Sequence, residues 1–346
     1  MIGFKFRVKM TQLFAIASVS IALGSGIASC SRRSAENDAL ILGRLHKWNA
    51  EAQGRESEIN RDEQYMLLPE AAQTGDLNIV KTALARGPNR RTLNQALLMA
   101  ARSEPLVIGY GGQEEAERRY TAIARLLLEK GAGIEARDEG GSTPLISAAG
   151  NGDTALVKLL LEKGAAIEAT NSFSQTPLIS AACMCPSVDM PETDNVVRLL
   201  LDMGANIEAT DKEGGTALLA AASWGRDTIL KILLDRGANI EARDNKGNTA
   251  LLISAAGNAY PTGNAVQVLL ARGGDIAATN NNGDTALILA ATNGGFEDLG
   301  IVRMLLSGGA DVHARNNKGR TALDSAVQNG RSAIVPVLRA AMAKSR

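Results

Sequence analysis

The sequence predicts an all-α solenoid of about seven to eight stacked helix-turn-helix units, counting degenerate units at the ends, joined by β-hairpin-like turns. A Thr recurs at spacings of 33, 40, 33, 36 and 36 residues: Thr143, Thr176, Thr216, Thr249, Thr285 and Thr321. A Gly precedes each Thr by twelve residues: Gly131, Gly164, Gly204, Gly237, Gly273 and Gly309. Each unit also carries two short apolar runs, and neither run can bury its apolar side without neighbouring units.

The unit Lys212–Asp244 shows how each element arises. A polar turn precedes Thr216, which starts a short helix rich in Ala. Gly225 breaks that helix, and a second helix follows with aliphatic residues over Ile229–Leu234. Gly237 ends the second helix, at a position that tolerates a left-handed backbone. A polar arm then leads into the next turn.

The motif T-P-L-x-x-A-A at Thr143–Ala149 and Thr176–Ala182, followed by L-L-x-x-G-A, resembles the ankyrin repeat over roughly residues 62–346. The resemblance implies a non-enzymatic protein-binding module, in which hairpin tips and first helices line a concave groove. Ankyrin repeats usually carry a His two residues after the Pro, whereas this chain has aliphatic residues or Asp there: Ile146, Ile179, Leu219, Leu252, Ile288 and Asp324. The Thr–His hydrogen bond of the family is therefore expected to be missing.

Residues 1–29 are predicted to be a lipoprotein signal peptide, because three basic residues precede an apolar stretch on the short side for a membrane span of about 20 residues. Ile27–Cys30 is similar to a bacterial lipobox, which implies a lipid on Cys30 that anchors the chain to a membrane. Ser31 after that Cys implies an outer-membrane lipoprotein facing the periplasm. An ordinary secretory signal with an incidental Cys, or a marginal membrane anchor, is the alternative.

Residues 30–61 are predicted to form a tether and an N-terminal capping helix ahead of the repeat domain, residues 62–346. Apolar residues at helical spacing over Ala39–Ala52 suit a helix that covers the exposed end of the stack. A partner-binding helix is the alternative.

Insertions fall repeatedly between the first and second helix of a unit: Ser103–Arg119, Cys183–Asp194, Asn258–Asn264 and Asn293–Asp298. Such insertions map to one face of a solenoid and mark either a binding face or a tolerant surface. Cys183 and Cys185 lie in one of them. They would form either a strained disulfide or two free thiols, and two thiols are too few for a structural zinc site.

The charges argue against nucleic acid as a partner. The chain has 37 basic and 37 acidic residues; without residues 1–29, which hold three basic and no acidic residues, 34 face 37, a net charge of −3. No catalytic or cofactor motif is present, and His46 and His313 show no metal-site spacing. We expect neither enzymatic activity, nor a cofactor, nor a metal, and we expect a monomer. Repeated serines (Ser147, Ser180, Ser254) and a column of Glu (Glu135, Glu168, Glu208, Glu241) suit packing, capping or a solvated face.

The surface residues carry the functional hypothesis. Aromatic residues make up only 3% of the chain, yet Phe173 is predicted at a hairpin tip and Trp224 at the end of a first helix. We expect an unknown protein partner to bind around Phe173, Lys212, Trp224 and Lys246, with Tyr260 as a weaker candidate. The protein would then be either an envelope-anchored interaction module or a periplasmic immunity-type inhibitor that blocks a toxin or lytic enzyme.

Overall fold

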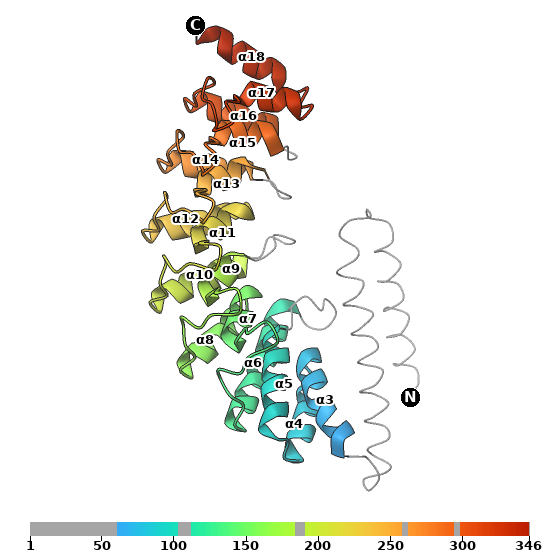
Figure 1. The fold of residues 1–346 in the computed structure, drawn as a ribbon. Helices are drawn as coiled ribbons and strands as arrows, with labels where there is room; N and C mark the ends of the chain where they lie inside the picture. Colours follow the sequence, from blue (N-terminus) through green and yellow to red (C-terminus); the bar gives the residue numbers. More distant parts are fainter. Residues whose placement is uncertain (1–60, 103–111, 184–190, 258–261, 294–297, 346) are drawn as a thin grey trace.

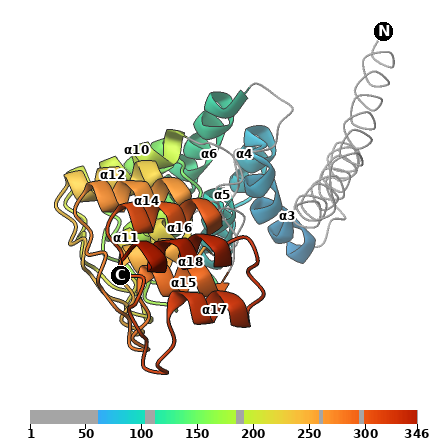
Figure 2. The same ribbon diagram turned by 90° about the horizontal axis from the view of Figure 1, so that it is seen from above.

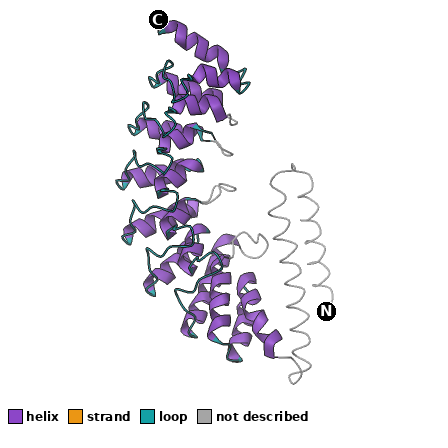
Figure 3. Cartoon of the chain, in the orientation of Figure 1, coloured by secondary structure: helices purple, strands orange, loops and turns teal. Residues whose placement is uncertain are grey.

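The computed structural model describes residues 61–102, 112–183, 191–257, 262–293 and 298–345. Within these ranges the regular structure is helical, apart from one isolated antiparallel bridge between Thr279 and Thr285 (Figure 3). The helices form eight pairs, which confirms the predicted all-α repeat architecture. The pairs are α3 (Arg61–Thr74) with α4 (Leu77–Ala85), α5 (Arg90–Arg102) with α6 (Gly112–Glu129), α7 (Pro144–Gly150) with α8 (Thr154–Glu162), α9 (Pro177–Ala182) with α10 (Pro191–Asp202), α11 (Ala217–Ser223) with α12 (Asp227–Asp235), α13 (Ala250–Ala255) with α14 (Gly263–Ala271), α15 (Ala286–Asn293) with α16 (Asp298–Ser307), and α17 (Ala322–Gln328) with α18 (Val335–Lys344).

The pairs follow one another along a curved stack, from α3 and α4 at one end to α18 at the other (Figure 1). The substantial helix–helix contacts join members of one pair or of neighbouring pairs. First helices such as α9, α11 and α13 lie on the inner side of the curve, and second helices such as α10, α12 and α14 lie on the outer side. Seen along the stack, the arms between pairs project together on one side (Figure 2). The stack therefore presents one continuous inner surface of first helices bordered by arms.

The recurring Thr begins the first helix as its N-cap. Each Thr hydroxyl oxygen accepts a hydrogen bond from the backbone N–H three residues later, at 3.2–3.4 Å. All six Thr side chains are buried. In the last copy the third residue is Asp324, whose carboxylate also accepts from the N–H of Thr321 at 2.9 Å and from its hydroxyl at 2.8 Å. These bonds from Thr321 hold the pKa of Asp324 below its usual range. A side-chain cap on backbone N–H groups thus stabilises the turn where the family's His is missing.

Small side chains allow the first helices to pack closely. The Ala residues in the middle of these helices are at most 2% exposed: Ala148, Ala149, Ala181, Ala182, Ala221, Ala222, Ala255, Ala290 and Ala291. Second helices contribute the larger aliphatic side chains, including Leu156, Leu160 and Leu200. Because each layer is completed by the next pair, the core runs the length of the stack rather than closing on itself. In the last described pair, Val327 is 57% exposed at the position that is a buried Ala in earlier copies.

The six recurring glycines that end second helices, from Gly131 to Gly309, adopt the predicted left-handed backbone, with φ between 84° and 97°. The prediction for Gly237, at φ 88°, is confirmed.

Some second helices begin earlier than the sequence suggested. Residues 103–119 were expected to form a loop, but α6 already begins at Gly112. The segment Gly112–Arg119 is rich in Gln, Glu, Ala and Arg, which favour helix, so it extends the second helix instead of lengthening the loop. In the same way α10 begins at Pro191, inside the insertion predicted for Cys183–Asp194. The insertions nevertheless fall between first and second helices, as expected.

The predictions for the first sixty residues are not tested. The signal peptide (1–29), Cys30 and the capping helix at Ala39–Ala52 lie outside the described residues. Among the helices that the structure does describe, none combines the length and apolar character required to cross a membrane.

Candidate functional site

Each hairpin tip is held by a side chain five residues before the Thr. In the tip before α11, the carboxylate of Asp211 accepts from the N–H groups of Glu213 at 2.9 Å and Gly215 at 2.7 Å. Asp244, Asn280 and Asn316 make the same pair of bonds in the later tips. These Asx turns pre-organise the tips without help from any partner.

Neighbouring tips are joined into one line by backbone hydrogen bonds. The N–H of Lys212 donates to the carbonyl of Phe173 at 3.0 Å, and that of Asn245 donates to Glu213 at 2.9 Å. Equivalent bonds link Ser172 to Gly140, Asn281 to Lys246 and Asn317 to Asn282, each at 2.9 Å. The tips therefore form one continuous hydrogen-bonded edge, which borders the first helices.

The tip before α9, Asn171–Gln175, differs from the others in two ways. Phe173 is 65% exposed, the most exposed large apolar side chain among the described residues. Ser174 has φ 61°, at the position where the other five tips carry a Gly with φ of 70–78°. A side chain in this region is strained, so this tip combines strain with an exposed aromatic residue.

Below the tips, the first helices form a floor that is half-buried. We call the residues four positions after the first five of the recurring Thr residues the groove floor: Ser147, Ser180, Ala220, Ile253 and Leu289. The equivalent residue of the last copy, Ser325, is buried at 3% exposure and is not part of this floor. Between α5, α7 and α9 the floor opens into a polar hollow of about 400 Å³. Its lining includes Arg102, Asp138, Ser147, Asn151 and Ser180, besides the tip residues Asn171 and Gln175.

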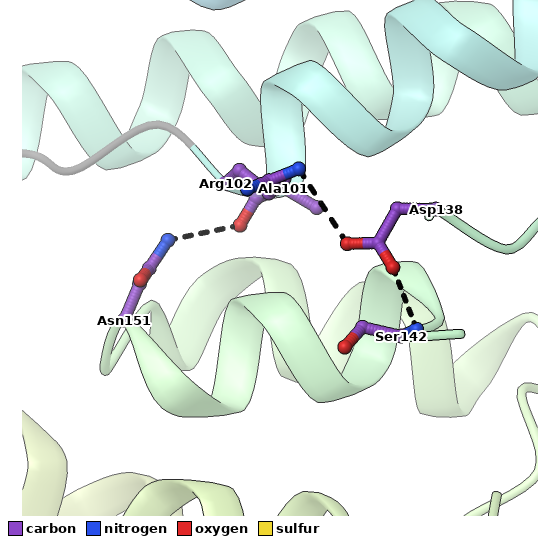
Figure 4. A network of polar contacts seen from close by, with 5 residues as sticks. All are labelled: Ala101, Arg102, Asp138, Ser142 and Asn151. Carbon is purple, nitrogen blue, oxygen red and sulfur yellow. Dashed lines mark hydrogen bonds and ion pairs between the residues drawn. The ribbon is translucent and has the colours of Figure 1, made fainter. Parts of the chain in front are cut away.

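The N-terminal wall of the hollow is a small polar network (Figure 4). Arg102, at the end of α5, lies 3.5 Å from the carboxylate of Asp138. Asp138 also accepts from the N–H of Ser142 at 2.8 Å, and the side-chain amide of Asn151 donates to the carbonyl of Ala101 at 3.1 Å. The network joins the ends of α5 and α7 to one tip, so the wall has a fixed shape.

Four of the five predicted binding residues lie on this surface. Phe173 and Lys212 occupy hydrogen-bonded neighbouring tips, and Lys212 and Lys246 are exposed. Trp224 is the C-cap of α11 and is half-buried, about 10 Å along that helix from its tip end, because seven residues rise about 1.5 Å each. The fold therefore brings Phe173 and Lys212 together and places Trp224 on the opposite border of the groove. Tyr260 lies outside the described residues.

The Glu column has a role that the sequence did not reveal. The carboxylate of Glu208 accepts from the N–H of Asn239 in the next arm at 2.7 Å. Equivalent bonds join Glu135 to Ala166, Glu168 to Asn206 and Glu241 to Asp275, at 2.7–2.8 Å. Glu135, Glu168 and Glu208 are exposed and Glu241 is half-buried, which agrees with a largely solvated face, but these carboxylates also bridge neighbouring repeats. The one signal was their strict recurrence in register.

Two ionisable groups are strongly affected by burial. Burial raises the pKa of Asp153, the N-cap of α8, to about 6. Burial, with a smaller effect of the Asp211 carboxylate, raises the pKa of the Cys183 thiol to about 11, so that this thiol is neutral near pH 7. Cys185 lies outside the described residues. No cluster of three or more metal-ligating side chains occurs in the ranges that the structure describes.

The predicted serines have different roles. Ser254 is buried and donates to the carbonyl of Ala222 at 3.3 Å, which confirms a packing role. Ser147 and Ser180 instead face the hollow. His313 contacts the hydroxyl of Ser345 at 2.9 Å, whereas His46 lies outside the described residues.

Comparison with known proteins agrees with this geometry. A comparison with curated protein sequences finds no match. The family model for ankyrin repeats (3 copies) matches residues 114–211, 188–261 and 252–344, which together cover more than half of the chain. Ankyrin-repeat domains are typically non-catalytic modules that bind other proteins. With stacked helix pairs, projecting tips and three matches in succession, this chain belongs to the ankyrin-repeat family.

Proposed function

We propose that this chain is a non-enzymatic protein-binding module of the bacterial cell envelope, held at a membrane by a lipid on Cys30. The observation that carries the binding role is the exposed Phe173 on a pre-organised tip beside the groove. The carbonyl and N–H of Phe173 are both hydrogen-bonded within the tip line. A partner that buries this ring therefore gains contact area while little backbone entropy is lost.

The neighbouring charges give the partner surface its character. Lys212 and Lys246 are exposed along the same edge, and no ion pair involves either of them in the described part of the chain. An apolar pocket flanked by acidic side chains would complement Phe173 and these ammonium groups.

The binding role is tested by chemical crosslinking in envelopes of cells that make the full chain, followed by capture and mass spectrometry. We expect Phe173→Ala to reduce recovery of the specific partner by about thirtyfold, the equivalent of about 2 kcal/mol for an aromatic anchor. The matched control is Met203→Ala, because Met203 is also exposed, at 53%, but follows a second helix on the outer face.

Equal recovery with both variants would contradict the proposed site. If the captured partner is a toxin or lytic enzyme that the protein inhibits at nanomolar affinity, the module acts as an inhibitor and not as a scaffold.

The lipid anchor is tested separately with labelled palmitate. The wild-type chain should incorporate the label and float with membranes, and Cys30→Ser should abolish both. The support for this anchor is the lipobox-like sequence Ile27–Cys30 alone. An unlabelled wild-type protein would overturn the anchor and leave the binding role standing.

A further inference from the structure

The groove floor changes its chemistry along the stack. The five floor residues are half-buried, and they run from hydroxyl through methyl to large aliphatic side chains: Ser147, Ser180, Ala220, Ile253 and Leu289. The column three residues further along each helix, also half-buried, holds small side chains and shows no such trend: Gly150, Cys183, Ser223, Ala256 and Thr292. The two ends of this continuous surface therefore present different side chains to a ligand: polar ones at one end and apolar ones at the other.

The end at α7 and α9 is polar, and several of its hydrogen-bonding groups are not fully used within the protein. The hydroxyl groups of Ser147 and Ser180 make no hydrogen bond within the described part of the chain, and both line the hollow. The amide of Asn151 uses its N–H on Ala101, so its oxygen still has accepting capacity. The side-chain oxygen of Gln175 accepts from Asn171, so the N–H groups of Gln175 still have donating capacity. Both donors and acceptors thus face the hollow.

The hollow carries no net charge of its own. Its lining contains one basic and one acidic side chain, Arg102 and Asp138, which lie 3.5 Å apart. A charged ligand group would have to compete with that pair. Uncharged groups that both donate and accept, such as peptide amides or the side chains of Ser, Thr, Asn and Gln, match the remaining capacity.

The end at α13 and α15 is apolar. Ile253 and Leu289 pack against the core from the floor and remain half-exposed. The hydroxyl of Thr292 donates to the carbonyl of Ile288 at 2.6 Å, so it is used inside its own helix. An aliphatic or aromatic side chain is the ligand group that this end stabilises by burial.

We propose that the groove binds a linear segment of its partner in a single direction. Uncharged polar residues of that segment occupy the hollow over α7 and α9, and apolar residues occupy the floor over α13 and α15. The inference rests on the proposed binding function and specifies the ligand of that same groove. Because neighbouring helices lie roughly 8–10 Å apart, the five floor helices span about 32–40 Å, which an extended segment of about twelve residues covers.

The direction follows from unequal costs. A segment bound in reverse would place apolar side chains over Ser147, Ser180 and Asn151 and leave their hydrogen-bonding groups buried without partners. It would also place polar side chains over Ile253 and Leu289, where they find no hydrogen-bonding partner and their burial costs free energy. Both errors act together, so we expect the reversed segment to bind at least about tenfold more weakly.

The experiment selects random twelve-residue peptides on phage against the full chain. We expect the selected peptides to carry Ser, Thr, Asn or Gln in one half and Leu, Ile, Phe or Met in the other half, always in the same order. The best peptide and its reversed sequence are then synthesised, and their dissociation constants are measured by fluorescence anisotropy. A photo-crosslinker on the polar end should label α7 or α9, and one on the apolar end should label α13 or α15.

Substitutions at Ser147 and Ser180 test whether the groove floor causes the preference for one peptide direction. Ser147→Leu with Ser180→Leu should bring the forward and reversed affinities to within about threefold of each other, while Lys158→Leu, on the exposed face of α8, should leave their ratio unchanged. Ser147→Ala with Ser180→Ala removes only the hydroxyl groups and should lower the ratio as well. This smaller change gives the answer if the Leu variant does not fold.

Equal binding of the two sequences, or selected peptides without a polar and an apolar half, would overturn the single direction. A selection that enriches no peptide would overturn the linear segment itself. Partner capture that depends on Phe173 would survive either result, because it concerns the tips, so failure of this inference is distinguishable from failure of the proposed function.

Discussion

The buried carboxyl of Asp153 should make the protein less stable at neutral pH than at mildly acidic pH. Asp153 caps α8 by accepting from the N–H of Leu156 at 2.8 Å, and it is 3% exposed. It is the one charged side chain among the described residues that is buried. Desolvation raises its pKa to about 6; the hydrogen bond from Leu156 opposes this effect and the carboxylate of Glu117 adds to it. Asp153→Asn keeps an oxygen acceptor of similar shape and removes the charge.

The sign follows from the difference between the folded and unfolded states. The folded protein holds the proton up to about pH 6, whereas the unfolded chain releases it near pH 3.8. The contribution of Asp153 to the free energy of unfolding is therefore fully present below pH 3.8. It is lost as the pH rises through 6. At about 1.36 kcal/mol per pKa unit the gap corresponds to roughly 3 kcal/mol as an upper bound. Because the roughly 3 kcal/mol is an upper bound, we expect Asp153→Asn to gain about 1–2 kcal/mol at pH 7.5.

The assay is urea unfolding followed by circular dichroism, at steps from pH 4 to pH 8, for the parent and the variant. The difference in unfolding free energy should be near zero at pH 4, grow between pH 4 and pH 6.5, and stay constant above. Asp76→Asn is the control, since Asp76 caps α4 in the same way but is only half-buried. A variant that is less stable than the parent at pH 7.5, or a difference that is the same at every pH, would refute the reasoning.

Two further substitutions test the contacts within and between repeats. Glu208→Ala removes the acceptor for the N–H of Asn239 and should destabilise the stack by about 1 kcal/mol in urea unfolding, while Glu208→Gln keeps an acceptor and should cost less than half of that. Gly237→Val should lower stability by at least about 2 kcal/mol, because φ is 88° there and a β-branched residue is strained; a Cβ would meet no atom within 4 Å, so a cost below about 0.5 kcal/mol would contradict the backbone argument.

The sequence predicted the parts of the fold that follow from register. The spacing between Thr216 and Gly237 located two helices, a cap and a left-handed glycine, because each depends on neighbours within one unit. The early start of α6 at Gly112 was missed, since the insertion was assumed to lack structure. The bond from Glu208 to the next arm was missed for another reason: the pattern within one unit does not show which atoms of the neighbouring unit it faces.

The candidate site was predictable to a similar degree. Register alone placed Phe173 at an exposed tip, and the structure places it there. Register could not tell how deeply Trp224 is buried, and as a half-buried C-cap it is a less clean probe of binding than Phe173. The gradient from Ser147 to Leu289 was not recognised, because the sequence does not show which helix position lines the groove until the curvature of the stack is known.

The strained tip permits a last prediction in which stability and binding move in opposite directions. Ser174 adopts φ 61° where the other five tips have Gly, so Ser174→Gly should relieve strain and stabilise the fold by about 0.5–1 kcal/mol in urea unfolding. The same change makes the backbone next to Phe173 more flexible. A partner must then restrict the orientation of Phe173 when it binds, which costs conformational entropy. Recovery of the crosslinked partner should therefore fall by about threefold, although the protein is more stable. If stability rises and recovery is unchanged, the strain at Ser174 has no part in presenting Phe173. If stability falls, the left-handed backbone at Ser174 is not a source of strain.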